Sequence, residues 1–448
     1  MTTKKGLFIT DDGKNVVVTF ALVSSLFLLW GFCNGMIDVM DRHFQTELHL
    51  TLGQSAWVQF AHYLGYFLMS LPAGWLAIKL GYKGGIIVGL LLVACGGFWF
   101  IPATHIAAFW AFLLGVCLIA SGLTFLETIA NPYTTVLGPK EFAATRINLA
   151  QSGNSIGWFF GPLAGGLYFY SKDAAGNSTG SQTLWIPYVG VAVVVLILAV
   201  LFYIADVPDI KMEDEYHLDD SVPNVSRSIW THPHFIFAIA AQFFYVGAQA
   251  SIFGFFIFYM TSQVPPIPPS WNHHIISSWF EMKDGVLRIS DAGASYLQSG
   301  GFLCFFAGRY TGANLLKRHS ASKILGLYGV LNVIVCLLIF AQLGWISTLC
   351  IFLSFFFMSV MFPTIFALGI HGLGARAKRA AGYIVMAIMG GAVLSKVTGR
   401  VSDLYGVSHG FIVPLICFLF VAIYGFAWPR LSQSASSRES KAVHPVLH

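Results

Sequence analysis

Charged residues are scarce in this chain of 448 residues. Lys and Arg number 25 and Asp and Glu number 20, so charged residues make up only 10% of the sequence, compared with about 25% in an average soluble domain. Hydrophobic residues account for 56%, and the mean hydropathy is +0.71. So few charges cannot cover a surface that faces water. The composition therefore excludes an ordinary cytosolic enzyme, a nucleic-acid-binding protein and a disordered chain.

Metal-binding and disulfide patterns are also missing. The seven cysteines all lie inside apolar runs, and no CxxC or Cys/His spacing occurs, so neither a disulfide framework nor a zinc site is indicated. We interpret these cysteines as small apolar packing residues. The pair His273–His274 lies in a polar segment, and two adjacent histidines without further ligands are typical of a solvated loop. We expect neither a bound metal nor a cofactor.

Long apolar runs dominate the rest of the chain. The N-terminal stretch lacks the short apolar core and cleavage site of a secretory signal, so we expect the first run to remain a membrane span. A span needs roughly 20 apolar residues to cross about 30 Å of hydrocarbon. The runs are continuous rather than alternating, which predicts an all-α membrane protein with twelve transmembrane helices. We place them at 16–40, 53–79, 84–102, 106–137, 145–170, 184–205, 232–262, 291–315, 321–342, 345–372, 377–404 and 407–429.

A charge-rich break divides these spans into six and six. We predict an N-terminal six-helix bundle over 1–205, a cytoplasmic linker over 206–231, a C-terminal six-helix bundle over 232–430 and a cytoplasmic tail over 431–448. The halves resemble each other, since Arg146 and Arg379 each precede a Gly-rich helix. Paired six-helix repeats with a binding site at their interface are typical of the major facilitator fold. A Gly-rich packing helix of any membrane protein is the alternative interpretation.

The distribution of Lys and Arg predicts the orientation, because short cytoplasmic loops carry an excess of both. If the N-terminus is inside, the inner loops contain Lys79, Lys83, Lys140, Arg146, Lys317, Arg318, Lys323, Arg376, Lys378 and Arg379. The outer loops then contain only Arg42, Lys172, Lys283 and Arg288. We therefore expect both termini to be cytoplasmic and the polar segment 263–290 to be an outer loop.

Two carboxylates fall within predicted spans, where ionisable residues are costly and point to function. Asp38 lies towards the outer end of the first span, and Glu127 lies near the middle of the fourth. Burial disfavours the charged form of a carboxyl group, so both side chains are candidates for taking up and releasing a proton. For Glu127 the alternative is a structural hydrogen bond to a neighbouring helix. For Asp38 it is an ion pair at the helix end, because Asp41 and Arg42 follow it.

Amide side chains accompany these acids in the spans. They are Asn34, Asn131, Gln151, Asn154 and Gln249, and the aromatic residues Trp30, Phe243 and Tyr245 lie near them in the sequence. Amides and carboxylates can bind the hydroxyl groups of a neutral, polyhydroxylated ligand, and an aromatic ring can stack on its apolar face. Each single amide can equally join two helices. Lys396, in the eleventh span, can extend to the interface, pair with a carboxylate or contact substrate.

Several motifs resemble the L-fucose permease family of fucose–galactose–glucose–proton symporters. They are WGFCNGMID, QFAHYLGYFLMSLPAGWL, GLTFLETIANPYTTVLGP, RINLAQSGNSIG, FFYVGAQ and MFPTIFALGIHGLG, in order along the chain. The resemblance implies a twelve-helix major facilitator fold that imports a hexose with a proton by alternating access. It assigns sugar binding and proton coupling to Asp38 and Glu127, and it matches Asn34, Gln151 and Asn154 to family amides.

The chain departs from the family pattern at several positions. Gly35 replaces the second Asn of the first-helix pair, Lys396 replaces an uncharged residue, and Ile78 stands where the wider superfamily usually has an acid. The outer loop over 263–290 also looks longer. These differences affect the identity of the sugar rather than the fold.

The sequence therefore predicts a proton-coupled symporter for a neutral monosaccharide: L-fucose, a related hexose or an N-acetylhexosamine. We expect it to lie in a bacterial inner membrane, to contact sugar, proton and lipid bilayer but no nucleic acid, and to function as a monomer. Within transporters, the alternative is a sodium-coupled or facilitative glucose/galactose carrier. A sugar sensor with a transporter fold and a membrane enzyme are rival classes, but the sequence has neither a sizeable output segment nor a visible catalytic cluster.

Overall fold

The computed structural model describes residues 7–9, 13–138, 143–171, 179–205, 229–271, 278–283, 285–316, 319–371, 373 and 377–443, and most of them are helical. Several predicted features lie outside these residues, among them most of the linker 206–231 and the pair His273–His274. The chain divides into two compact units.

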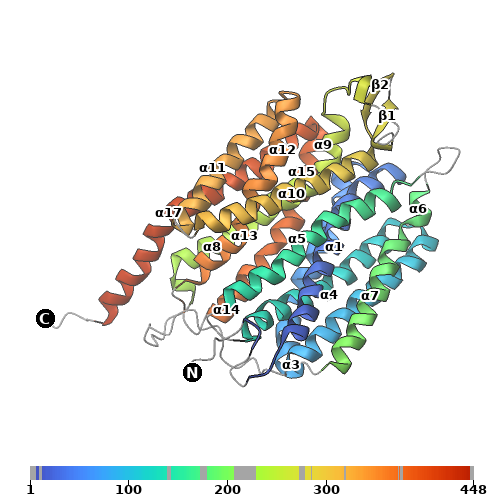
Figure 1. Ribbon diagram of the computed structural model, residues 1–448. Helices are drawn as coiled ribbons and strands as arrows, with labels where there is room; N and C mark the ends of the chain where they lie inside the picture. Colours follow the sequence, from blue (N-terminus) through green and yellow to red (C-terminus); the bar gives the residue numbers. More distant parts are fainter. Residues whose placement is uncertain are drawn as a thin grey trace. The chain divides into compact units, whose positions relative to one another are not determined.

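The first unit comprises Met1–Glu215 together with Gly254–Phe302. Its helices are α1 (Val17–Glu47), α2 (Leu52–Ser55), α3 (Trp57–Ile106), α4 (Phe109–Val136), α5 (Ala143–Tyr168), α6 (Gly180–Thr183), α7 (Trp185–Ile204) and α9 (Phe256–Ser262), with the start of α10 (Asp291–Leu316) and the 3₁₀ turn η3 (Pro269–Trp271) (Figure 1). The second unit comprises Tyr216–Phe253 and Leu303–His448. The predicted division into 1–205 and 232–430 remains a prediction.

The second unit is also built from helices. It contains η2 (Ile229–Thr231), α8 (Pro233–Gly254) up to Phe253, the remainder of α10, α11 (Ala321–Phe340), α12 (Trp345–Met358), α13 (Met361–Ile370), α14 (Ala377–Met386), η6 (Ala387–Met389), α15 (Gly390–Tyr405), α16 (Val407–Gly410) and α17 (Ile412–Val443). The hydroxyl of Tyr245 on α8 donates to the backbone oxygen of Met358 at 3.0 Å, so α8 is joined to the end of α12.

The helices follow the predicted spans, with interruptions. The second and third predicted spans both lie in α3, where two helices meet at a kink at Gly81, whose φ is 71°. This left-handed conformation suits glycine because it has no Cβ. The seventh, tenth and eleventh predicted spans are each divided, into α8 and α9, α12 and α13, and α14 to α15.

The polar segment 263–290 contains structure that the sequence analysis did not predict. Strands β1 (Phe280–Lys283) and β2 (Val286–Ile289) form an antiparallel hairpin in which Glu281 is opposite Arg288 (Figure 1). Gly285 has a φ of 75° at the turn, which glycine adopts without strain. The backbone amide of Ile267 donates to the oxygen of Leu287 at 2.9 Å, so the preceding loop packs along the hairpin.

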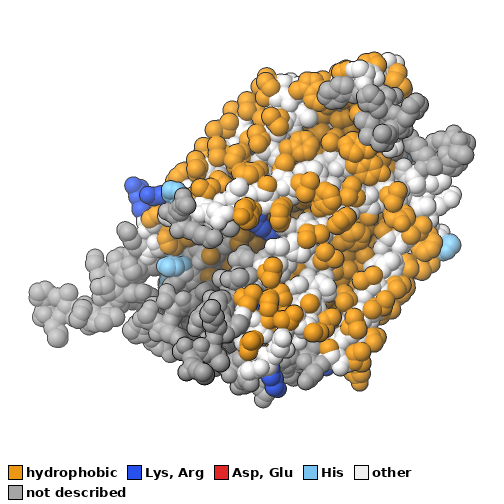
Figure 2. Space-filling model, in the orientation of Figure 1, with side chains coloured by type: hydrophobic (Ala, Val, Ile, Leu, Met, Phe, Trp, Pro, Cys, Tyr) orange, Lys and Arg blue, Asp and Glu red, His pale blue; other side chains and the backbone are white. Residues whose placement is uncertain are grey.

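The outer faces of the helices are apolar. Among the described residues, nine helical segments are long and apolar enough to cross a membrane. The segment 57–78, α5 and α10 fall outside that set; α5 carries Arg146, Gln151 and Asn154, and α10 carries Asp291 and Arg309. Figure 2 shows hydrophobic side chains spread over the visible helices, as expected for surfaces that face lipid.

Glycines allow close packing of α5 on α1. A Cβ on Gly161 would lie 2.6 Å from the Cα of Gly35, and a Cβ on Gly157 or Gly31 would overlap backbone atoms of the opposite helix. Gly153, Gly157, Gly161 and Gly165 recur every fourth residue, so they form one face of α5. Small residues at this spacing let two membrane helices approach closely.

Candidate functional site

One face of α1 carries a row of polar side chains. Asn34, Asp38 and Asp41 follow one another at intervals of four and three residues, so they lie on the same side of the helix. Their exposed fractions are 6%, 4% and 0%. A buried carboxylate is costly unless it is neutralised or hydrogen-bonded. The hydrogen-bond partners of Asp38 and Asp41 therefore determine whether each carboxyl group can stay ionised.

Gln59 of α3 connects the two aspartates. Its Nε2 donates to Oδ1 of Asp38 at 2.9 Å and to Oδ2 of Asp41 at 3.2 Å. The second oxygens, Oδ2 of Asp38 and Oδ1 of Asp41, are buried without a hydrogen-bond partner among the described residues. Within the part of the chain that the structure describes, each carboxyl group therefore receives a single hydrogen bond, from the same nitrogen.

Arg42 does not form the ion pair with Asp38 that we considered as an alternative. Its Nε lies 2.8 Å from Oδ1 of Asp291, at the start of α10. The hydroxyl of Thr46 on α1 donates to the other oxygen of Asp291 at 3.5 Å. Arg42 therefore ties the end of α1 to α10.

Glu127 belongs to a second polar group, between α4 and α5. It is half-buried, and Asn131 lies one turn further along α4. The side-chain amide of Asn131 donates to the backbone oxygen of Glu127 at 3.0 Å, and its Oδ1 accepts from Nε2 of Gln151 at 2.9 Å. The structure thus brings together three of the predicted site residues.

Tyr66 connects this group with α1. Its hydroxyl accepts a hydrogen bond from Nε1 of Trp30, and it interacts with the side chains of Asn34 and Glu127. Side chains from α1, α3 and α4 therefore meet at one buried hydroxyl inside the first unit. The result is a set of neutral donors and acceptors next to a carboxylate, which can bind hydroxyl groups of a ligand.

Asn154 on α5 makes the helix-joining contact that we considered for each amide. Its Nδ2 donates to the backbone oxygen of Phe27 on α1 at 3.3 Å. Gly31 allows this approach, because a Cβ there would overlap the backbone oxygen of Asn154. Asn154 thus helps to hold α5 on α1, and its role in ligand binding stays a prediction.

The second unit contains the two remaining predicted residues and an apolar cavity. Gln249 on α8 and Lys396 on α15 are half-buried.

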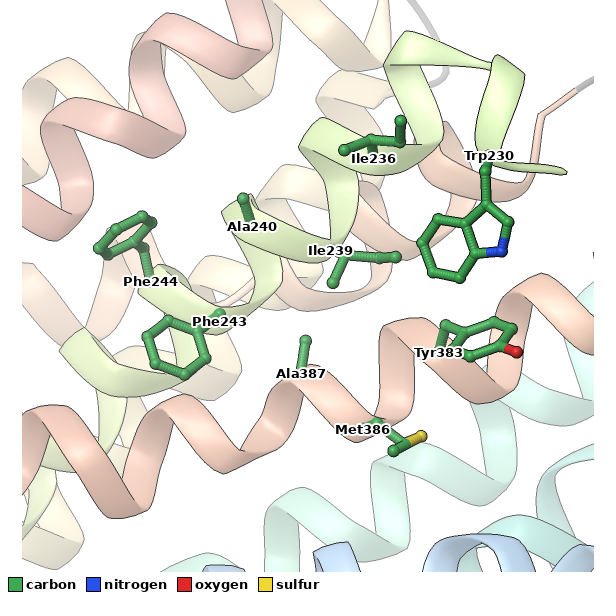
Figure 3. A pocket seen from close by; sticks show the side chains of 9 residues that line it. All are labelled: Trp230, Ile236, Ile239, Ala240, Phe243, Phe244, Tyr383, Met386 and Ala387. Atoms are coloured by element: carbon green, nitrogen blue, oxygen red, sulfur yellow. The ribbon is translucent and has the colours of Figure 1, made fainter.

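The apolar cavity of the second unit has a volume of about 500 Å³, and Figure 3 shows its lining side chains, with Trp230 beside Tyr383 at one end. It is lined by Trp230, Ile236, Ile239, Ala240, Phe243, Phe244, Tyr383, Met386 and Ala387. This set includes neither Gln249 nor Lys396, and its aromatic rings can contact an apolar ligand face.

Gln59, Tyr66 and the burial of Asp41 were not predicted from the sequence. Gln59 and Tyr66 are seven residues apart, which places them on one helical face; this spacing, within the motif QFAHYLGY, was the available signal. Asp41 was interpreted as a residue beyond the span because we ended that span at residue 40. Helix α1 continues to Glu47, so Asp41 lies within it.

Comparisons with known proteins agree with this architecture. The family model described as Major Facilitator Superfamily matches residues 17–396. The chain is 33% identical to the L-fucose-proton symporter of Escherichia coli K12 over 433 residues, which cover 92% of this chain and 93% of that protein. It is 31% identical to the glucose/galactose transporter of Brucella abortus biovar 1, covering 93% and 95%.

A solved structure agrees with the family match. The crystal structure of FucP, a Major Facilitator Superfamily transporter in the outward conformation, matches with a TM-score of 0.66 and 33% sequence identity. The match covers 92% of this chain and 99% of that one. The predicted fold class is thereby confirmed.

Proposed function

Because the chain belongs to the Major Facilitator Superfamily and, within it, to the L-fucose permease family, we propose that it is a proton-coupled symporter that imports a neutral monosaccharide by alternating access. The observation that carries this proposal is the set of polar groups inside the first unit. Buried Asp38 is bonded to Gln59, and half-buried Glu127 lies beside Tyr66 and Asn131, which accepts from Gln151. Transporters of this fold bind substrate near the middle of the membrane on such side chains.

Asp38 and Glu127 are the proton-coupling groups. Protonation from the outer side removes their buried charge and creates donors for sugar hydroxyls. Asn34, Asn131, Gln151 and Asn154 supply further hydrogen bonds, and Gln249 and Lys396 are the substrate-binding residues of the C-terminal half. The two six-helix halves, 1–205 and 232–430, then move relative to each other, so that the site opens inward and releases sugar and proton.

The ligand is neutral and rich in hydroxyl groups: L-fucose, a related hexose or an N-acetylhexosamine. Amide and carboxyl groups match hydroxyl donors and acceptors, whereas an anionic ligand would require Lys or Arg side chains, which are scarce in the predicted spans. The L-fucose-proton symporter and the glucose/galactose transporter among the relatives support this class of substrate.

The protein acts in a bacterial inner membrane, as a monomer, with both termini in the cytoplasm. The relatives are bacterial, and the excess of Lys and Arg in alternate loops supports the orientation. The second candidate is a sodium-coupled or facilitative glucose/galactose carrier, and the Brucella relative that is named a glucose/galactose transporter is the reason to test it.

Reconstituted vesicles test the proposal. Uptake of labelled L-fucose, galactose, glucose and N-acetylglucosamine is measured with and without an inward proton gradient, and with and without sodium. We expect one of these sugars to accumulate only when the proton gradient is present. Accumulation that requires sodium, or uptake that a proton gradient does not change, would overturn the proton-coupling proposal.

A further inference from the structure

We propose that Asp41 is a second proton-binding carboxylate of this protein. In this proposal Asp38 and Asp41 hold at least one proton between them whenever α9 and the start of α10 lie against α1. Proton binding is then what permits this closed arrangement. The inference rests on the proposed function, because it assigns part of the proton coupling to a residue beyond Asp38 and Glu127.

The geometry of the two carboxyl groups carries the argument. Asp38 and Asp41 share the single donor nitrogen of Gln59, at 2.9 and 3.2 Å, and each retains one buried oxygen without a partner among the described residues. Gln59 is itself only 1% exposed. Two negative charges held this close by one nitrogen in a buried site oppose each other, and one of them is then neutral.

The charged neighbours do not neutralise this pair. Arg42 is adjacent to Asp41 in sequence, but its guanidinium bonds to Asp291. On the side of α5, Tyr170 is an electrostatic neighbour of Asp41, and its hydroxyl donates to the backbone oxygen of Val39 at 2.9 Å. His43 packs against the rings of Phe44, Phe169 and Tyr170.

Among the described residues, the elements that cover the pair bring no countercharge. From α3 the pair meets the neutral amide of Gln59, and His62 lies one turn further along that helix. Helix α9 reads FIFYMTS, in which Tyr259 is the only titratable residue. The start of α10 contributes Asp291, which is already bonded to Arg42.

The junction of α8 and α9 seals the pair from solvent. A Cβ on Gly254 would lie 2.7 Å from Oδ2 of Asp41 and 3.1 Å from Nε2 of Gln59, so the backbone here rests directly on the two side chains. Phe258 of α9 lies under the guanidinium of Arg42, 5.5 Å from ring centroid to Cζ. With the α8–α9 junction and α9 in this position, Asp41 is 0% exposed.

Proton binding and closure are therefore linked. If α9 and α10 move away from α1, both carboxylates gain water and can ionise. If α9 and the start of α10 return to α1, one proton must be bound first. The Arg42–Asp291 ion pair then holds the start of α10 against α1. Since the closed form binds more protons than the open form, raising the pH disfavours closure.

The test compares Asp41→Asn with the wild type in reconstituted vesicles. Asparagine has a similar size but carries no titratable proton. The packing of α9 and the start of α10 against α1 therefore no longer requires a bound proton at this position. We expect sugar exchange in the absence of a gradient to continue at a pH about one unit higher than in the wild type, which is the strength of interaction at which two acids titrate as a coupled pair. Gradient-driven accumulation should fall, because closure then proceeds without a proton.

Asp291→Asn is the matched control. It removes the ion pair with Arg42 but keeps the carboxylate pair, so the exchange rate should fall without a shift along the pH axis. Asp41→Glu should retain the wild-type pH profile because it restores a carboxyl group. Thermal unfolding of each purified variant checks that it is folded.

The outcomes separate this inference from the proposed function. An Asp41→Asn profile that superimposes on the wild type, or an equal shift in Asp291→Asn, would overturn the role of Asp41. If Asp38→Asn still abolishes accumulation in the same assay, the proposed function stands. If the wild type itself shows no accumulation with a proton gradient, the proposed function fails instead.

Discussion

At the scale of single residues, Glu127 is the most direct test of proton coupling. Its side chain faces Tyr66, and its backbone oxygen is bonded to Asn131. Glu127→Gln keeps the shape of the side chain and, like the protonated acid, has a donor and an acceptor, but it cannot release a proton. We expect gradient-driven accumulation to disappear. Glu281→Gln, on the hairpin outside the site, is the control, and accumulation by Glu127→Gln equal to that of this control would exclude Glu127 from coupling.

Tyr66 tests the hydrogen-bonded part of the site. Tyr66→Phe removes the hydroxyl that accepts from Trp30 and interacts with Asn34 and Glu127. The loss of one hydrogen bond of about 1 kcal/mol corresponds to roughly a fivefold weaker affinity, so the half-saturation concentration of the transported sugar should rise by about that factor. Tyr203→Phe is the control, because Tyr203 is 73% exposed. Equal affinity in both variants would place Tyr66 outside the sugar site.

The difference between predicted and observed site residues has a physical cause at this scale. Asp38 and Glu127 could be identified from the sequence because a carboxylate within an apolar run is unusual in itself. Gln59 and Tyr66 could not, because a single amide or hydroxyl in a span is common, and its importance depends on which side chains another helix brings to it. The pairing of Arg42 with Asp291, 249 positions apart, likewise depends on the tertiary structure.

At the scale of helices, the glycine face of α5 is expected to determine stability. Gly161→Val would place side-chain atoms against the backbone of Gly35, and overpacking of this kind costs about 1–3 kcal/mol. We expect a lower unfolding temperature of the purified protein in detergent. Gly190→Val is the matched control, because a Cβ there has no described atom within 4 Å. Equal unfolding temperatures for the two variants would contradict tight packing of α1 on α5.

Helices were also the part of the fold that sequence patterns predicted best. Apolar runs of sufficient length marked the helices, since an unsatisfied backbone is too costly in a bilayer. The ends were less accurate, because helices such as α1 extend past the apolar run into polar residues up to Glu47. The hairpin β1–β2 was missed because its strands are only four residues long, too short for a clear alternation.

At the scale of the whole molecule, coupling is a thermodynamic quantity that one experiment can measure. One charge crossing 100 mV is worth about 2.3 kcal/mol, which corresponds to a sugar concentration ratio of roughly 50. If each sugar enters with one proton, the steady-state ratio in vesicles should change by about that factor per 100 mV of clamped potential, without sodium. A facilitative carrier would give a ratio of one at every potential, and a sodium symporter would respond only when sodium is present. If the logarithm of the sugar concentration ratio rises twice as steeply with the clamped potential, two protons enter with each sugar. This result is expected if the Asp38–Asp41 pair delivers one proton and Glu127 delivers the other.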